Sequence, residues 1–125
     1  MDTDIINYRK IFSARKNRFT SFTTEKEAQQ SLCNMLGGRM EVKCKYGRID
    51  LITNELLVEV KKYSSHNAKM ALGQVLVYAT LYDHLKPTLA FLGSENQLYN
   101  EVGEKFGINI WWVQDGIWSV GYSIE

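Results

Sequence analysis

The sequence predicts a single α/β domain with a mixed β-sheet, and three observations lead to this fold class. Residues 49–52 and 56–60 are apolar, strand-forming runs on either side of a turn-forming segment at 53–55. Residues 68–85 carry apolar side chains at helical spacing, over a length too great for a strand. The apolar run 88–93 then predicts a buried strand parallel to 56–60, reached through a helical crossover. A chain of 125 residues has room for one such core and no second.

The two apolar runs, 49–52 and 56–60, are expected to form a hairpin. The sequence before this hairpin predicts a capped helix and a first strand. Thr24 is the expected N-cap, Glu27 stands at the capping-box position, and the glycines at 37 and 38 are a stop signal. Residues 39–45 alternate as a strand does. We therefore expect a helix followed by a meander of three strands.

The chain after the hairpin predicts the long helix, a second capped helix and a closing hairpin. Ser94 and Gln97 form a second capping box, and the helix that they open ends at Gly107. Asp115-Gly116 is a strongly favoured turn between two further strands, 108–114 and 117–123. The tryptophans at 111, 112 and 118 are expected in the core or in a subunit contact rather than as base-stacking platforms. The apolar residues that define the long helix are Met70, Leu72, Val75, Leu76, Ala79 and Leu81.

The predicted hairpin at the centre of the chain, residues 47–63, places two carboxylates opposite each other. If Asn54 and Glu55 are the two loop residues, counting outward pairs Asp50 with Glu59. Side chains alternate with period two along a strand, so Asp50, Glu59 and Lys61 share one face. The other face is expected to carry Ile49, Leu51, Val58 and Val60.

Two like charges at opposed positions lie roughly 5 Å apart and are destabilising. A divalent cation between the carboxylates would offset this repulsion, as would Lys61 and Arg48 acting as neutralising partners. The alternative is a solvated outer face that carries ordinary charges. Apolar residues on both sides of the strands favour a covered sheet, in which a buried acid pair needs a specific reason.

An acid followed by Glu-x-Lys on the next strand resembles the PD-(D/E)XK nuclease superfamily, with Asp50 as the first acid and Glu59-Val60-Lys61 as the E-x-K element. Ile49 stands where the family's proline would precede the acid. The spacing alone is a weak signal, so the neighbouring elements must supply specificity. The resemblance implies a restriction-endonuclease-like core, α-β-β-β-α-β, with an added helix and a C-terminal hairpin.

Two helices add to the resemblance. Gln74 and Tyr78 lie at i and i+4 on one side of the long helix, and this looks like the Gln-x-x-x-Tyr element of RecB-like nucleases. Similar proteins carry a metal-site glutamate on the first helix, for which Glu25 and Glu27 are the candidates. Glu25 lies near the centre of that helix's apolar stripe and Glu27 lies well off it, so we expect Glu25. The order of all these elements is similar to small nucleases of viral and mobile-element genomes.

The resemblance implies a Mg²⁺-dependent deoxyribonuclease, most simply an endonuclease, in which Mn²⁺ substitutes for Mg²⁺. Asp50, Glu59, the Val60 carbonyl and Glu25 would hold the ion, and Lys61 would orient the attacking water. Gln74 and Tyr78 would position the water or the phosphate. A resolvase, an exonuclease and an RNA substrate stay open. A different class is a catalytically inactive nucleic-acid-binding or assembly module with the same fold.

Charge is unevenly distributed along the chain. Residues up to Lys86 hold 14 basic and 9 acidic side chains, and those after it hold 1 and 5. Residues 1–22 are expected to be a basic and aromatic arm, and residues 23–125 the nuclease domain. The arm either grips phosphates or packs its aromatic side chains on the domain or on a second subunit. The basic residues expected to bind DNA are Arg9, Lys10, Arg15, Lys16, Arg18, Lys43, Lys45, Arg48 and Lys62.

Composition also bounds the compartment and the assembly. The start of the chain lacks the pattern of a secretory signal, and no span is long and apolar enough for a membrane helix. Cys33 and Cys44 lack metal-binding spacing, so we expect free thiols in an intracellular protein of the cytoplasm, nucleoid or nucleus. A chain this small has little surface for a long target, so a homodimer or higher assembly is also expected.

Overall fold

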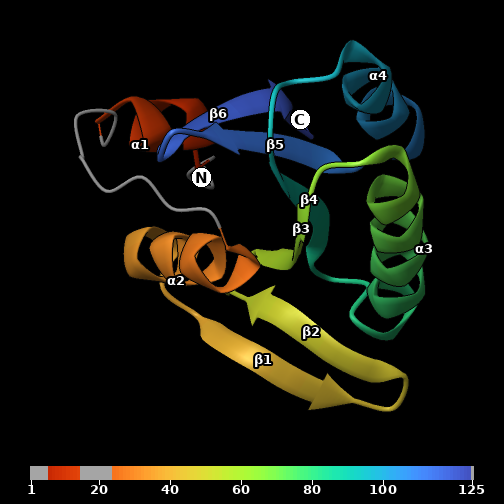
Figure 1. Ribbon diagram of the computed structural model, residues 1–125. Coiled ribbons are helices and arrows are strands. Elements are labelled where there is room, and N and C mark those ends of the chain that lie inside the picture. The colour runs from red at the N-terminus through yellow and green to blue at the C-terminus, as the bar shows by residue number, and fades with distance from the viewer. Residues whose placement is uncertain (1–5, 15–23, 125) are drawn as a thin grey trace, which may run out of the picture.

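The computed structural model describes residues 6–14 and 24–124, which form one six-stranded mixed sheet covered by helices (Figure 1). The strands lie side by side in chain order. The first three are antiparallel, the third to fifth are parallel, and the last is antiparallel to the fifth. The predicted α/β class and mixed sheet are therefore confirmed. The strands are β1 (Arg39–Cys44), β2 (Gly47–Ile52), β3 (Leu56–Lys62), β4 (Lys86–Leu92), β5 (Asn109–Gln114) and β6 (Ile117–Tyr122).

Four helices in the described part of the chain make this a three-layer fold. They are α1 (Tyr8–Ala14), α2 (Glu25–Leu36), α3 (Ser65–Leu81) and α4 (Gln97–Phe106). Helices α1 and α2 cover one face of the sheet, and α3 and α4 cover the other (Figure 1). Each face has its own buried apolar cluster, because the strands β3, β4 and β5 alternate their side chains between the two faces. Both parallel connections, through α3 and through α4, run over the same face, as equally handed crossovers must.

Most local signals in the sequence act as expected. Thr24 is the N-cap of α2 in a complete capping box with Glu27, and Gly37 ends the helix. The backbone amide of Thr53 donates to the Leu56 carbonyl at 2.9 Å, which closes the two-residue loop between β2 and β3. The turn between β5 and β6 has positive φ at both central residues, Asp115 and Gly116.

Two details of the helices differ from expectation. The N-cap of α4 is Asn96, whose side chain accepts from the Leu98 amide at 2.9 Å, and Ser94 instead accepts from the Gln114 side chain. The buried face of α3 consists of Ala68, Ala71, Val75 and Tyr78. This face packs on β3 and β4, and it leaves Met70, Leu76 and Leu81 exposed.

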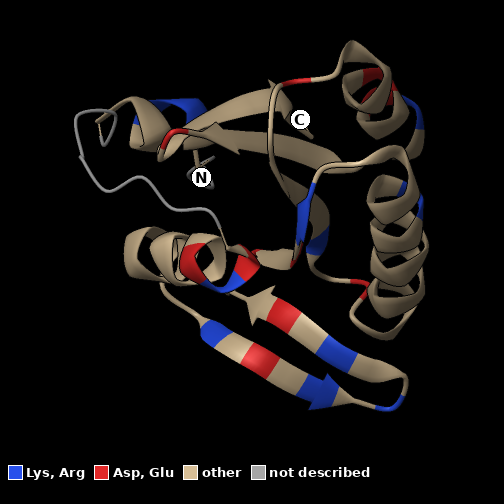
Figure 2. Cartoon of the chain, in the orientation of Figure 1, with Lys and Arg blue, Asp and Glu red and all other residues tan. Residues whose placement is uncertain are grey.

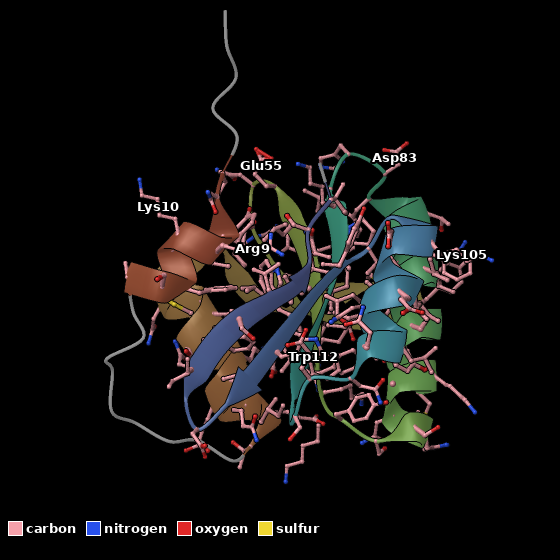
Figure 3. The ribbon with its side chains drawn as sticks, turned by 90° about the horizontal axis from the view of Figure 1, so that it is seen from above. Arg9, Lys10, Glu55, Asp83, Lys105 and Trp112 are labelled. Carbon is pink, nitrogen blue, oxygen red and sulfur yellow. The ribbon has the colours of Figure 1, made fainter. Side chains whose placement is uncertain are left out.

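The N-terminal helix packs on the domain. Tyr8 and Phe12 are buried, and their rings lie 5.1 and 5.0 Å from the Trp111 ring, centroid to centroid. Arg9 and Lys10 are exposed, and Lys10 projects away from the body of the molecule (Figure 3). The aromatic side chains of this segment therefore pack on the domain, and phosphate binding by Arg9 and Lys10 stays a prediction. Arg15, Lys16 and Arg18, and the proposed boundary at residue 22, lie outside the described residues.

The three tryptophans belong to the core, as expected. Trp111, Trp112 and Trp118 are buried, and Trp112 lies between the sheet and α4 (Figure 3). The Trp112 indole donates to the Asn100 side chain at 2.8 Å, so its polar edge is satisfied inside the protein. Cys33 and Cys44 are free thiols. Within residues 6–14 and 24–124, no helix combines the length and the apolar character that crossing a membrane requires.

Candidate active site

The two carboxylates expected to face each other do so. The backbone ladder of β2 and β3 pairs Ile52 with Leu57 and Leu51 with Val58, and it ends directly before Asp50 and Glu59. The Val60 amide donates to Asp50 Oδ2 at 2.8 Å, and the Asp50 amide donates to Glu59 Oε2 at 3.1 Å. Each carboxylate therefore accepts a hydrogen bond from the backbone of the opposite strand. This reciprocal pair fixes both acids at one position in the sheet.

The alternation expected along β2 is wrong at Ile49. This residue packs in the buried cluster beneath α3, whereas Leu51, Val58 and Val60 pack in the cluster beneath α2. The cause lies on the neighbouring strand, where the register of β1 and β2 is interrupted at Glu41, a non-glycine residue with φ of 56°. This irregular backbone breaks the period of two at the level of Asp50. Local strain of this kind concentrates at functional sites.

Burial dominates the electrostatics of the pair. The Glu59 side chain is 3% exposed, and burial together with the nearby Asp50 charge raises its pKa to about 8. Burial also raises the pKa of Asp50, against the lowering effects of the Val60 amide and of Lys61. Lys61 lowers the pKa of both acids, but its effect is smaller than the effect of burial. Without a further positive charge, Glu59 is mostly protonated at neutral pH.

Helix α2 adds Glu25 and a residue that the sequence did not single out. Glu25 Oε2 accepts from the Lys62 amide at 2.9 Å, and the Glu25 charge raises the pKa of both Asp50 and Glu59. Glu27 takes part in the capping box, whereas the Glu25 charge acts on the acid pair. The described carboxylates form no group of three that could hold a metal ion, so the role of Glu25 as a metal ligand stays a prediction. Gln29 is buried, and its Nε2 donates to the Asp50 carbonyl at 2.7 Å. Gln29 was missed in the sequence, although its position one turn after Glu25 is a signal that could have found it.

Helix α3 brings Tyr78 to the same site. Burial raises the pKa of the Tyr78 hydroxyl, and the Glu59 charge raises it further. This hydroxyl lies within hydrogen-bonding reach of the Arg48 backbone and against Gly47. Gln74 lies one turn earlier, and its Oε1 is buried without a hydrogen-bond partner in the described part of the chain. A buried amide oxygen of this kind has an unused capacity to accept a hydrogen bond.

Gly47 fixes how closely β2 approaches Tyr78. Its φ is +146°, and a Cβ built on it would lie 2.6 Å from the Tyr78 hydroxyl oxygen. We expect Gly47→Ala to lower the free energy of unfolding by about 2 kcal/mol in urea titrations, through backbone strain and this contact. Gly73→Ala is the matched control, because Gly73 lies in α3 with no atom within 4 Å of its Cβ position and should gain up to about 1 kcal/mol. Equal stability of Gly47→Ala and wild type would contradict this contact.

Basic residues alternate with two acids along β1 and β2, the edge of the sheet next to the acid pair (Figure 2). Arg48 does not neutralise the buried pair as expected, because it lies 3.6 Å from Glu41, which also binds Lys26. These contacts leave a basic edge on β1 and β2, while Lys62 extends it at the end of β3. The exposed residues of this edge are Lys43, Lys45, Arg48 and Lys62.

The donor set suits a hard divalent cation held by few protein ligands. Among the described residues, no three His, Cys, Asp or Glu side chains are grouped closely enough to hold a metal ion. Mg²⁺ does not need such a group, since it retains several waters and binds through one or two carboxylates. Asp50 and Glu59 provide two carboxylates. The raised pKa of each means that a nearby cation would favour its ionised form. The residues present therefore fit Mg²⁺.

Comparison with known proteins finds three viral relatives. Each is a KilA-N domain-containing protein of Acanthamoeba polyphaga mimivirus and is 38% identical to this chain. The first aligns over 90 residues, or 69% of this chain, and the other two over 78 residues, or 62%. The chain spans only 24%, 31% and 21% of their respective lengths. No family model and no solved structure matches the chain.

Proposed function

We propose that this chain is a Mg²⁺-dependent deoxyribonuclease that hydrolyses phosphodiester bonds at a PD-(D/E)XK-type site. The observation that carries the proposal is the carboxylate pair on adjacent strands, the half-buried Asp50 and the buried Glu59, with Lys61 acting on both. A buried like-charged pair is costly unless a cation or a proton relieves it. Pairs with strongly perturbed pKa values are concentrated at functional sites.

The surrounding architecture supports the same family. The elements follow the order helix, three strands, helix, strand, which is the order of a restriction-endonuclease-like core, and α4 with the β5–β6 hairpin are additions to it. The basic edge around Lys43, Lys45 and Arg48 supports a polyanionic partner.

In the proposed mechanism, each residue of the site has a separate role in hydrolysis. Asp50 and Glu59, with the Val60 carbonyl, would hold Mg²⁺, and Glu25 would add negative charge from α2. When bound, the ion polarises the phosphate and lowers the pKa of a coordinated water. Lys61 would hold the attacking water and stabilise the charge that develops on the phosphate. Gln74 Oε1, buried without a partner in the described part of the chain, would accept a hydrogen bond from this water, and Tyr78 would orient the scissile phosphate.

The test is cleavage of supercoiled plasmid, linear duplex and four-way-junction DNA in Mg²⁺, Mn²⁺ and EDTA. We expect cleavage in either metal and none in EDTA. Asp50→Asn keeps the shape of the side chain but removes its charge, and we expect it to lower the rate at least about 100-fold. The pattern of products separates an endonuclease from a resolvase and from an exonuclease.

Glu55→Gln is the matched control for this substitution. Glu55 lies in the loop of the same hairpin and is exposed at the rim of the molecule (Figure 3). This control should cleave at the wild-type rate. DNA binding without cleavage in either metal would reject the nuclease and favour an inactive binding module with the same fold. Equal rates for Asp50→Asn and wild type would reject this site.

A further inference from the structure

The turn between β1 and β2 presents the most exposed aromatic side chain in the described part of the chain. Cys44 pairs with Gly47, so Lys45 and Tyr46 form a two-residue turn. The Tyr46 side chain is 57% exposed, whereas the rings of the tryptophans are buried. The turn lies at the end of the two-stranded edge of the sheet, beyond the end of α3 (Figure 1). An aromatic ring at such a tip is available to a partner.

The surroundings of Tyr46 are basic. Lys43, Lys45 and Arg48 are all exposed. The two acids on these strands are Glu41, which pairs with Lys26 and Arg48, and Asp50 of the candidate site (Figure 2). Lys45 Nζ lies over the Tyr46 ring, 5.5 Å from its centroid. This cation–π contact positions the ring and occupies one of its two faces. An aromatic face among cations is the combination that binds single-stranded nucleic acid, by stacking and by phosphate contacts.

The tip is held in a defined place relative to the candidate site. Gly47, the neighbour of Tyr46, lies against the Tyr78 hydroxyl, and that hydroxyl responds to the charges of Glu59 and Asp50. Asp50 follows Tyr46 by four residues along β2, which corresponds to ~13 Å of extended strand. This distance equals about four nucleotide steps of a B-form strand. One nucleic-acid strand is therefore long enough to contact both places.

We propose that Tyr46 is a stacking platform for an unpaired nucleobase, on a strand whose phosphates follow the basic edge toward Asp50 and Glu59. The proposal rests on the proposed function and adds a preference for DNA with unpaired bases near the cleavage site. A protein partner fits less well, because the cations surround a single ring and no apolar patch adjoins it on these strands. Bases inside a duplex are already stacked, so Tyr46 distinguishes the two kinds of substrate.

The test measures binding in EDTA, so that it does not depend on cleavage. Affinities are compared for a single-stranded oligonucleotide, a blunt duplex, and a duplex with a single-stranded tail that carries 2-aminopurine. We expect Tyr46→Ala to weaken binding about tenfold for the two substrates with unpaired bases and less than twofold for the blunt duplex. Tyr46→Trp should retain the affinity, and stacking should quench the 2-aminopurine fluorescence with wild type but not with Tyr46→Ala.

Phe106→Ala is the matched control, because Phe106 is 53% exposed on α4, away from this edge, and should not affect binding. Unchanged affinity of Tyr46→Ala for unpaired DNA would overturn the platform, as would an equal loss for all three substrates. If the protein cleaves DNA normally and Tyr46→Ala does not change DNA binding, the platform is rejected and the proposed nuclease activity is retained. Binding that depends on Tyr46 without cleavage in Mg²⁺ would keep the platform and reject the nuclease.

Discussion

If the proposed mechanism holds, Lys61→Ala is expected to lower kcat for DNA cleavage at least about 100-fold, because it removes the positive charge that this mechanism places at the reacting phosphate. The Lys61 charge acts on both Asp50 and Glu59, from the same face of β3 as Glu59. The substitution should not weaken Mg²⁺ binding measured by calorimetry, since it removes a charge that repels the ion. A loss of kcat with metal binding intact therefore assigns the lysine to the chemical step.

Lys62→Ala is the neighbouring control for this prediction. Lys62 is exposed on the other side of the strand, and its backbone amide donates to Glu25. We expect a weaker affinity for DNA and a shallower salt dependence, with kcat within about threefold of wild type. If Lys61→Ala cleaves as fast as wild type, or if both lysine variants lose kcat equally, the specific role of Lys61 is wrong.

Glu59→Gln is expected to make the metal-free protein more stable at pH 8, although the same change removes a proposed metal ligand. The folded-state pKa of Glu59 is raised to about 8, above the ordinary value of 4.5. Between these values the unfolded chain loses the proton while the folded chain keeps it, so wild-type stability falls as the pH rises. The loss from this group is on the order of a few kcal/mol, and the amide of the variant does not titrate.

Urea unfolding in EDTA at pH 5 and at pH 8 measures this effect as a difference between wild type and variant. We expect the two proteins to be closest in stability at pH 5 and Glu59→Gln to be the more stable at pH 8. Adding Mg²⁺ at pH 8 should stabilise wild type and not the variant, because the ion binds the ionised carboxylate and displaces its proton. Glu55→Gln, in the exposed loop, should follow wild type throughout. The same pH dependence in wild type and Glu59→Gln would contradict the buried pair.

The sequence predicted the fold well where local rules apply. The capping box at Thr24, the loop before Leu56 and the turn at Asp115 each depend on a few neighbouring residues, so their signals are complete within the sequence. Prediction was wrong where tertiary contacts compete with such signals. Ser94 has the chemistry of an N-cap, but its hydroxyl bonds to Gln114 on β5, and Asn96 caps α4 in its place.

In the candidate site too, the sequence predicted the local features and missed those that depend on tertiary contacts. The sequence indicated Gln74 and Tyr78 from their spacing, but not the close approach of Tyr78 to Gly47. Gln29 was missed because its partner is a backbone carbonyl on β2, 21 residues away along the chain. The roles of these residues in metal binding and catalysis, the homodimer and the DNA contacts of the N-terminal segment stay predictions.

The sequence by itself determined the register that brings Asp50 and Glu59 together, because a two-residue loop pairs Ile52 with Leu57 and Leu51 with Val58. Only the tertiary structure decided the burial and the pKa values of the two carboxylates. Helices α2 and α3 cover the two faces of the sheet, and the backbone of β1 is irregular at Glu41, which has a positive φ. Glu25 approaches the pair from α2. Desolvation and Coulomb interactions depend on distances through space, so the raised pKa of Glu59 follows from packing that no local pattern encodes.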